Sequence, residues 1–183
     1  MVLAAGGDRL RGLGHSVFAP SYSGMGDRAH LLSRDIAIDT FVEDLVGVIQ
    51  SEELREVVLV GHSFGGIPIS GVADRIPQSI AHLVYLDANV IESGRSAFSL
   101  YPADVVEARI KAAESANSGL AVPPPQILPA VGGLKEGTAD YDWVLRRLTP
   151  HPLGAYTNPL KLQNPVGNGL PRTLCVAPNR PIR

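Results

Sequence analysis

The pattern of apolar and polar residues predicts strands alternating with helices in the first half of the chain. Residues 57–60 (VVLV) form an unbroken and mostly β-branched run, which suits a strand covered on both faces. Residues 81–87 (AHLVYLD) form a second strand pattern, and residues 16–19 (SVFA) form a shorter one that ends at Pro20. Helices are expected over 39–50 and from 64 to about 74. This alternation predicts a parallel sheet with right-handed crossovers, and therefore an α/β fold.

The second half of the chain has a different pattern. Helical stretches near 103–115 and 140–148 are separated by Pro123-Pro124-Pro125 and Gly132-Gly133, which cannot belong to regular structure. The strand pattern resumes only at residues 172–176. We therefore expect a core made of residues 1–95 plus 168–183. Residues 96–167 are expected to be inserted in it as a helical lid.

The first strand leads directly into a motif with chemical meaning. Gly61-His62-Ser63-Phe64-Gly65 matches G-x-S-x-G, the nucleophile elbow, in which a serine sits on a strained turn above the carboxyl end of a sheet. Glycines two residues before and after the serine remove a clash where the helix crosses the strand. Ser63 is therefore the candidate nucleophile. The Phe64 backbone N–H, at a helix N-terminus, is a candidate oxyanion donor.

Acyl transfer also needs a base and an acid that orients it. Asp87 follows the second strand at its carboxyl end, and we weigh a catalytic acid there equally against a turn cap. His30, in the loop before the first long helix, is one candidate for a role in the site. His151, which follows Ser63 and Asp140/Asp142 in the chain order nucleophile, acid, base, is another. Trp143 in the lid is a candidate substrate-binding residue.

Composition and charge limit the partners and cofactors that the chain is expected to bind. The net charge is −2 and the basic residues are scattered, so nothing indicates a nucleic-acid partner or an anionic membrane surface. No apolar run approaches the length of a membrane span, and the single cysteine allows no disulfide within the chain. We expect a cytoplasmic protein. No cluster has metal-ligand spacing and no loop has phosphate-binding form, so no metal or cofactor is predicted.

With these motifs in hand, the chain resembles the α/β-hydrolase superfamily, and within it the small esterase and hydroxynitrile-lyase-like branch. The matching segments, besides the elbow, are residues 14–20 (GHSVFAP), 24–28 (GMGDR), 82–88 (HLVYLDA), 141–150 and 170–173 (LPRT). Their order and spacing carry the resemblance over nearly the whole chain. The resemblance implies a three-layer core with a mostly parallel sheet and a helical lid.

The ends depart from the family pattern. Such enzymes begin with a strand ending in His-Gly, which supplies a second oxyanion donor, and no His-Gly precedes Asp8 here. They end with an acid loop, another strand and a Gly-His-Asp-like segment carrying the base, whereas this chain stops at Arg183. We therefore expect a core truncated at both ends, as a fragment, a shortened product or a shifted reading frame. Exposed sheet edges would then favour a homodimer.

The resemblance implies hydrolysis of a small carboxylic ester through an acyl-serine intermediate. The leucine-, valine- and proline-rich lid suggests an apolar acyl or alcohol group. Two alternatives stay open. One is a lyase acting on a cyanohydrin-type substrate at the same site, and the other is a non-catalytic chain that keeps the pocket without the chemistry. A histidine within hydrogen-bond reach of Ser63 would favour an enzyme.

Overall fold

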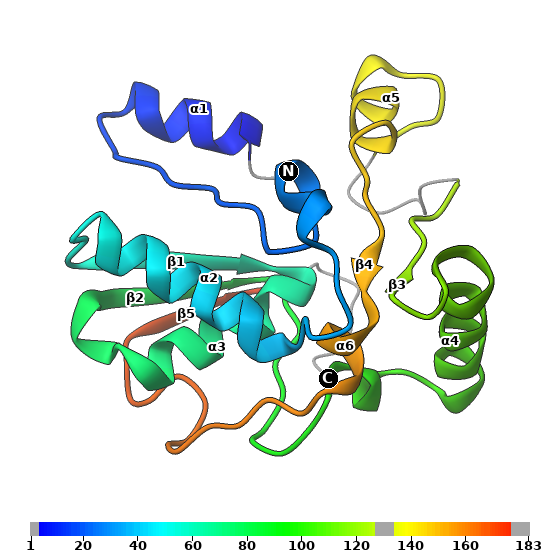
Figure 1. Ribbon diagram of the computed structural model, residues 1–183. Helices are drawn as coiled ribbons and strands as arrows, with labels where there is room; N and C mark the ends of the chain where they lie inside the picture. Colours follow the sequence, from blue (N-terminus) through cyan, green and yellow to red (C-terminus); the bar gives the residue numbers. More distant parts are fainter. Residues whose placement is uncertain (1–3, 127–133, 177–183) are drawn as a thin grey trace.

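The structure, a computed structural model, describes residues 4–126 and 134–176 (Figure 1). Gly132-Gly133, a turn expected from the sequence, lies outside the described residues. The α-helices are α1 (Ala4–Gly12), α2 (Ile38–Ser51), α3 (Gly66–Arg75), α4 (Ala103–Asn117), α5 (Ala139–Leu145) and α6 (Leu153–Thr157). The strands are β1 (Val57–His62), β2 (Ile80–Leu86), β3 (Ala121–Val122), β4 (His151–Pro152) and β5 (Arg172–Cys175). Short 3₁₀ turns are η1 (Gly26–Leu31), η2 (Ser63–Gly65), η3 (Pro77–Ser79) and η4 (Ala97–Leu100).

The main sheet is parallel and has β2 at its centre. β1 and β2 pair from Val57 opposite Ile80 to His62 opposite Leu86, and β5 pairs with the other edge of β2. The strand order is therefore β1-β2-β5. The connection from β1 to β2 runs through α3, as parallel neighbours require a crossover. The prediction of an α/β fold with a parallel sheet is confirmed.

Helices α2 and α3 cover one face of this sheet (Figure 1). Phe41 and Val42 on α2 and Ile67 on α3 are fully buried, as is Leu83 on β2. Helix α2 begins at Ile38, where the Ala37 N–H donates to the Thr40 hydroxyl at 3.1 Å. That contact satisfies one of the N-terminal amide groups that no helical carbonyl can reach. The apolar stripe seen in the sequence is therefore the face that forms the core.

The 96–167 segment does not stand apart from the core. Helix α4 packs on β3, and β3 forms a two-stranded antiparallel sheet with β4. Beyond β4 the chain enters the interior, where Ala155 and Leu160 are almost completely buried among core residues. Helix α5, by contrast, lies at the far end from the main sheet (Figure 1). Helix α6, near the end of the 96–167 segment, therefore anchors this segment to helix α2.

The expected strand at residues 16–19 does not form. The residues are extended, but no strand lies beside them in the described part of the chain. The Val17 carbonyl accepts a hydrogen bond from the Arg11 guanidinium at 2.9 Å. A strand exists only where a neighbour pairs its backbone groups, so a short run with strand character is insufficient by itself. The local sequence was compatible with a strand but could not supply its partner.

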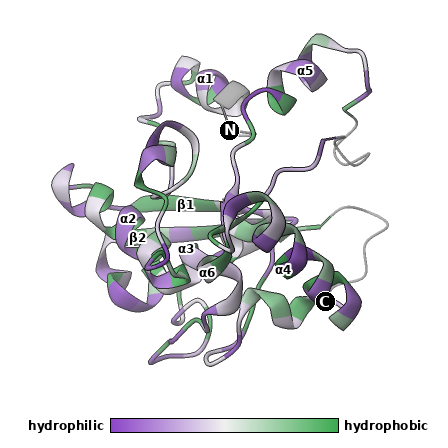
Figure 2. Ribbon diagram, turned by 45° about the vertical axis from the view of Figure 1, so that its right-hand side comes forward, coloured by the Kyte–Doolittle hydropathy of each residue, from purple (hydrophilic) through white to green (hydrophobic). Residues whose placement is uncertain are grey.

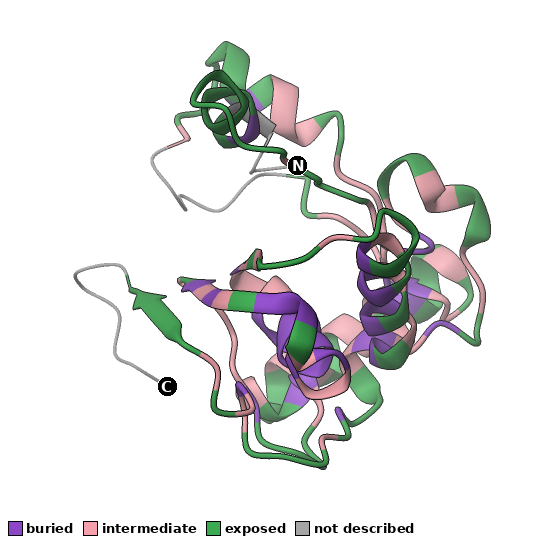
Figure 3. Cartoon of the chain, turned by 90° about the vertical axis from the view of Figure 1, so that its left-hand side faces the viewer, coloured by how far each residue is buried: buried purple, intermediate pink, exposed green. Residues whose placement is uncertain are grey.

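Apolar side chains remain on the outside of the sheet. On the face opposite α2 and α3, Val58 is 59% exposed. At the edge, Leu174 is 53% exposed, and Figure 3 shows β5 exposed along its length. Figure 2 shows that β1 is largely hydrophobic along its length. Uncovered apolar strands at a sheet edge are sites where another chain can pair. The expected self-association through a sheet edge stays a prediction, and β5 is the strand on which to test it.

We expect Leu174→Lys to shift any self-association of the chain toward the monomer, because a charge on an edge strand opposes pairing with a second strand. Sedimentation velocity over a range of concentrations measures the effect. Leu13→Lys is the matched control, since Leu13 is 70% exposed in the turn after α1 and belongs to no strand. Equal association of both variants would exclude the β5 edge as the contact.

Candidate active site

The elbow is formed by the junction of β1, η2 and α3. Strand β1 ends at His62, Ser63 follows with a φ of 52°, and α3 begins at Gly66. A non-glycine residue in the left-handed region costs about 1–3 kcal/mol and persists only where its surroundings enforce it. The Ser63 carbonyl accepts a hydrogen bond from the Asn89 N–H at 2.7 Å. The loop after β2 therefore helps to hold the strained serine in place.

Two glycines allow this turn, and they are not the same pair that the motif suggests. A Cβ on Gly61 would lie 2.6 Å from the Gly65 carbonyl oxygen and 2.8 Å from Ile69 Cδ1. A Cβ on Gly65 would meet only the Tyr22 hydroxyl, at 4.0 Å. The next residue, Gly66, is the second crowded position, because a Cβ there would lie 2.8 Å from the Ala88 Cβ. Gly61 therefore lets strand and helix cross, and Gly66 lets the loop after β2 approach.

Sheet register brings Ser63 and Asp87 side by side. His62 pairs with Leu86, and Ser63 and Asp87 are the residues that follow this pair at the carboxyl ends of β1 and β2. Asp87 also has a positive φ, 43°, and its N–H donates to the Cys175 carbonyl at 2.6 Å. The position agrees with both sequence-based interpretations, a catalytic acid and a turn residue. Its catalytic role stays a prediction.

The Phe64 side chain is held by rings from three parts of the chain. Its ring centroid lies 4.6 Å from that of His151 on β4, 5.2 Å from Tyr156 on α6 and 6.2 Å from Phe41 on α2. We call Tyr22, Phe41, Phe64, Phe98, His151 and Tyr156 the aromatic cluster. Each favourable ring pair contributes roughly 0.5–1.5 kcal/mol beyond the area it buries. Phe64, which directly follows Ser63, is therefore held in place by side chains from both the core and the 96–167 segment.

His151 lies within this cluster as a neutral ring. Burial lowers the pKa of His151 from 6.5 to about 4, and the positive charge of Arg109 adds to the lowering, although a hydrogen bond with the Pro152 carbonyl opposes it. Since that carbonyl can only accept, Nδ1 carries the proton in this 3.3 Å contact and Nε2 is left as an acceptor. A ring of such low basicity is poorly matched to general-base work near pH 7.

The remaining sequence-based candidates do not join the elbow. His30 is exposed on η1. Trp143 lies on α5, where its ring contacts the Arg147 guanidinium at 4.3 Å and no ring of the aromatic cluster. Among the described residues, no group forms a hydrogen bond with the Ser63 hydroxyl. The structure therefore places Asp87 next to Ser63 by strand register and His151 against the Phe64 ring, but leaves His30 and Trp143 apart.

Sequence reasoning missed the contribution of Tyr156 and Arg109 to this region. Tyr156 touches Phe64 and His151, and the Arg109 guanidinium lies over the Tyr156 ring. A tyrosine among the proline- and glycine-rich turns of residues 149–165 indicated burial but not its neighbours. No local signal distinguished Arg109 from other helix arginines.

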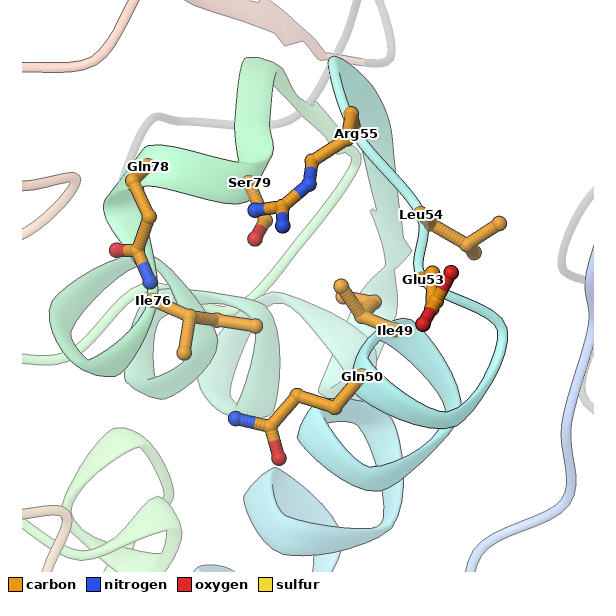
Figure 4. A pocket seen from close by; sticks show the side chains of 8 residues that line it. All are labelled: Ile49, Gln50, Glu53, Leu54, Arg55, Ile76, Gln78 and Ser79. Atoms are coloured by element: carbon orange, nitrogen blue, oxygen red, sulfur yellow. The ribbon is translucent and has the colours of Figure 1, made fainter.

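A pocket of about 450 Å³ lies at the opposite end of the sheet (Figure 4). It is lined by residues that precede β1 and β2, including Leu54, Arg55 and Ser79, and by Ile49 and Ile76 from the ends of α2 and α3. Figure 4 shows the Arg55 guanidinium directed toward Ser79. Ligands of open α/β sheets bind at the carboxyl ends of the strands, where Ser63 lies. The reaction site is therefore sought at the elbow and not here.

In residues 4–126 and 134–176, no group of three or more His, Cys, Asp or Glu side chains is arranged to hold a metal ion. The same part of the chain contains no helix with the length and apolarity to cross a membrane.

A parallel sheet whose strand ends in a left-handed serine at the start of a helix defines a hydrolase-type α/β fold. Residues 2–179 match the Alpha/beta hydrolase family, and the chain belongs to it. The resemblance to the α/β-hydrolase superfamily that the sequence indicated is therefore confirmed.

Relatives place the chain near esterases. It is 42% identical over 161 residues to a carbendazim hydrolyzing esterase of Nocardioides sp. (strain SG-4G), covering 84% of this chain and 64% of that protein. It is 36% identical over 80 residues to an alpha-hydroxynitrile lyase of Arabidopsis thaliana, covering 43% of this chain and 31% of the lyase. The chain thus spans less than two thirds of either relative.

Solved structures agree on the fold. An extracellular alpha/beta-hydrolase from a Paenibacillus species, described as sharing structural and functional homology with Tobacco Salicylic Acid Binding Protein 2, superposes with a TM-score of 0.74. The match has 22% identity and covers 91% of this chain and 68% of that one. At this identity the likeness shows the fold alone.

The crowding at Gly61 predicts the outcome of adding one methyl group. We expect Gly61→Ala to destabilise the fold by about 1–3 kcal/mol or more, because the new Cβ would overlap backbone at Gly65. Urea denaturation measures the change. Gly47→Ala, on helix α2 with nothing within 4 Å of the new Cβ, is the control and should stabilise by about 0.5–1 kcal/mol. A Gly61→Ala variant as stable as the parent would contradict the tight crossing.

The buried neutral His151 predicts acid sensitivity. Its folded pKa of about 4 lies below the usual 6.5, so its contribution is present above pH 6.5 and is lost as the pH falls toward 4. The loss is at most about 3 kcal/mol. Unfolding free energies at pH 7 and pH 4.5 should differ less in His151→Phe, which keeps an aromatic ring, than in the parent. His30→Gln, at an exposed site, should keep the parent's pH dependence.

Proposed function

We propose that this chain provides the nucleophile of a serine hydrolase that acts on a small carboxylic ester. One observation carries the proposal, namely the left-handed conformation of Ser63 at the carboxyl end of β1 (φ 52°). That conformation raises the hydroxyl above the sheet and leaves the following N–H, that of Phe64, at the start of a helical turn. The 42% identical esterase supports an ester as the substrate.

The reaction has two halves. Ser63 Oγ attacks the acyl carbon while its proton passes to a base, and the negative charge on the carbonyl oxygen is held by the Phe64 N–H. Collapse of this intermediate expels the alcohol, which takes up the proton, and leaves the acyl group on Ser63. Water then releases the acid and restores the serine. Asp87, beside Ser63 at the strand ends, is the proposed acid partner of the base.

The base is the open part of the proposal. The His151 imidazole contacts the elbow through the ring of Phe64, yet its pKa of about 4 makes it a weak base at neutral pH. Without a base, binding and the oxyanion donor give only a modest acceleration. We therefore propose a substrate-binding or packing role for His151, and slow turnover if no stronger base faces Ser63.

Two alternative functions each have an observation in their favour. The similarity to an alpha-hydroxynitrile lyase favours cleavage of a cyanohydrin-type substrate on the same serine. The lack of any hydrogen bond to the Ser63 hydroxyl in the described residues favours a chain that binds without catalysing. Both alternatives keep the elbow and differ only in what happens there.

A fluorophosphonate probe tests the nucleophile directly. We expect the folded chain to be labelled on Ser63, and Ser63→Ala to lose the label together with ester hydrolysis, by about 10³-fold or more. Intact-protein and peptide mass spectrometry locate the adduct, with 4-nitrophenyl acetate as the ester. Ser51→Ala, which removes an exposed serine at the end of α2, should be labelled like the parent.

The same experiment separates the alternatives. Cyanide release from mandelonitrile, lost in Ser63→Ala, with no ester hydrolysis would favour the lyase. A cooperatively folded chain with neither labelling nor turnover would overturn the enzymatic proposal and leave the non-catalytic one. His151→Gln and His30→Ala, assayed in parallel, show whether either imidazole activates the serine, since loss of labelling in only one identifies the base.

A further inference from the structure

We propose that Arg109 is a positioning residue that couples helix α4 to the oxyanion donor Phe64 through the ring of Tyr156. The catalytic meaning of this coupling depends on the proposed serine hydrolase, but the physical coupling does not. Arg109 is separated from Phe64 by 45 positions in sequence, so its effect must pass through the rings between them.

Arg109 lies between two tyrosines. Its Cζ is 4.2 Å from the ring centroid of Tyr101, just before α4, and 5.3 Å from that of Tyr156 on α6. Both distances fall within the range in which a cation is attracted to the face of an aromatic ring. The guanidinium therefore connects the start of α4 with α6.

Tyr156 then reaches the elbow. Its ring stacks on Phe98 at 5.1 Å with an interplanar angle of 16°, and meets the edge of Phe64 at 5.2 Å and 69°. With Arg109 and Phe98 fixing its orientation, Tyr156 presents one defined surface to Phe64. Phe64 also carries the N–H that is the proposed oxyanion donor. If Tyr156 were displaced, the Phe64 ring would lose its support, and the N–H would point less accurately at the oxyanion.

Hydrogen bonding explains only part of why an arginine occupies this position: the Arg109 side chain interacts with the Tyr156 hydroxyl and acts to lower the pKa of Tyr156, against the larger effect of burial. Arg109 Nη1 is buried without a hydrogen-bond partner, the one such side-chain atom in the described residues, and Arg109 forms no salt bridge there. A buried, unpaired donor on a charged group is costly. The guanidinium is therefore held by the faces of the two tyrosine rings and by its interaction with the Tyr156 hydroxyl. Two of these three contacts are made with Tyr156.

A pair of charge-removing variants on one helix tests the proposal. Arg109→Gln removes the cation between the rings, whereas Lys111→Gln removes a cation from the exposed side of the same helix α4. We expect Arg109→Gln to lower kcat for 4-nitrophenyl acetate roughly three- to thirty-fold with little change in KM, because the aim of the donor and not substrate binding is affected. Lys111→Gln should leave both constants unchanged.

A second measurement does not depend on turnover. In Arg109→Gln, the backbone amide signals of Phe64 and Tyr156 should show added microsecond-to-millisecond exchange by 15N relaxation dispersion, while the amide of Leu83 in the sheet should not. Arg109→Lys should restore part of both effects, since an ammonium also binds an aromatic face. If the parent chain has no esterase activity but Arg109→Gln still shows this added exchange, the proposed function is wrong and the coupling is supported.

Identical kinetics and identical Phe64 dynamics in Arg109→Gln and Lys111→Gln would overturn the proposal. If Arg109→Gln does not fold, Tyr101→Leu replaces it, because this change removes one of the two rings under the guanidinium and leaves Tyr156 intact. It should give the same selective broadening at Phe64. A Tyr101→Leu variant that folds and leaves Phe64 unchanged would also overturn the coupling.

Discussion

The close crossing of strand β1 and helix α3 is the constraint on which the rest of the structure depends. Gly61 lies so near the Gly65 carbonyl that no side chain fits between them, and Gly66 meets the loop after β2 just as closely. The crossing forces Ser63 into a left-handed conformation, and the Asn89 N–H fixes it there. A strained residue of this kind persists only when its neighbours leave no alternative, and here they come from β1, α3 and the exit of β2.

The aromatic cluster connects this crossing with the rest of the chain. The ring of Phe64 contacts Phe41 in the core and His151 and Tyr156 from the 96–167 segment. The segment expected to act as a lid is therefore packed at its end against the residue that follows the proposed nucleophile. The packing also has a chemical consequence, because the burial that fixes His151 lowers its pKa. The same surroundings that order the ring make it a weak base.

The sheet, in contrast, is sparsely covered. Its second face and its β5 edge expose apolar side chains such as Val58 and Leu174. The chain spans 64% of the length of the esterase relative. The proposed nucleophile, the proposed oxyanion donor and the acid candidate all follow the carboxyl ends of β1 and β2. These are the parts carried by β1, α3 and β2, and they do not need the exposed edges in order to assume their geometry.

The sequence by itself determined the elements built from local signals. The apolar run at 57–60, the stripe on 39–50 and the G-x-S-x-G motif predicted β1, α2 and the elbow, because strand and helix periodicity and tight glycine turns are local properties. Asp87 could also be placed, since parallel strands end at one edge. Only the tertiary structure decided that residues 16–19 have no strand partner among the described residues, that His151 is a largely buried, neutral ring, and that Arg109 meets Tyr156 and Tyr156 meets Phe64. Pairing, burial and ring contacts join residues far apart in the chain, and no spacing along it encodes them.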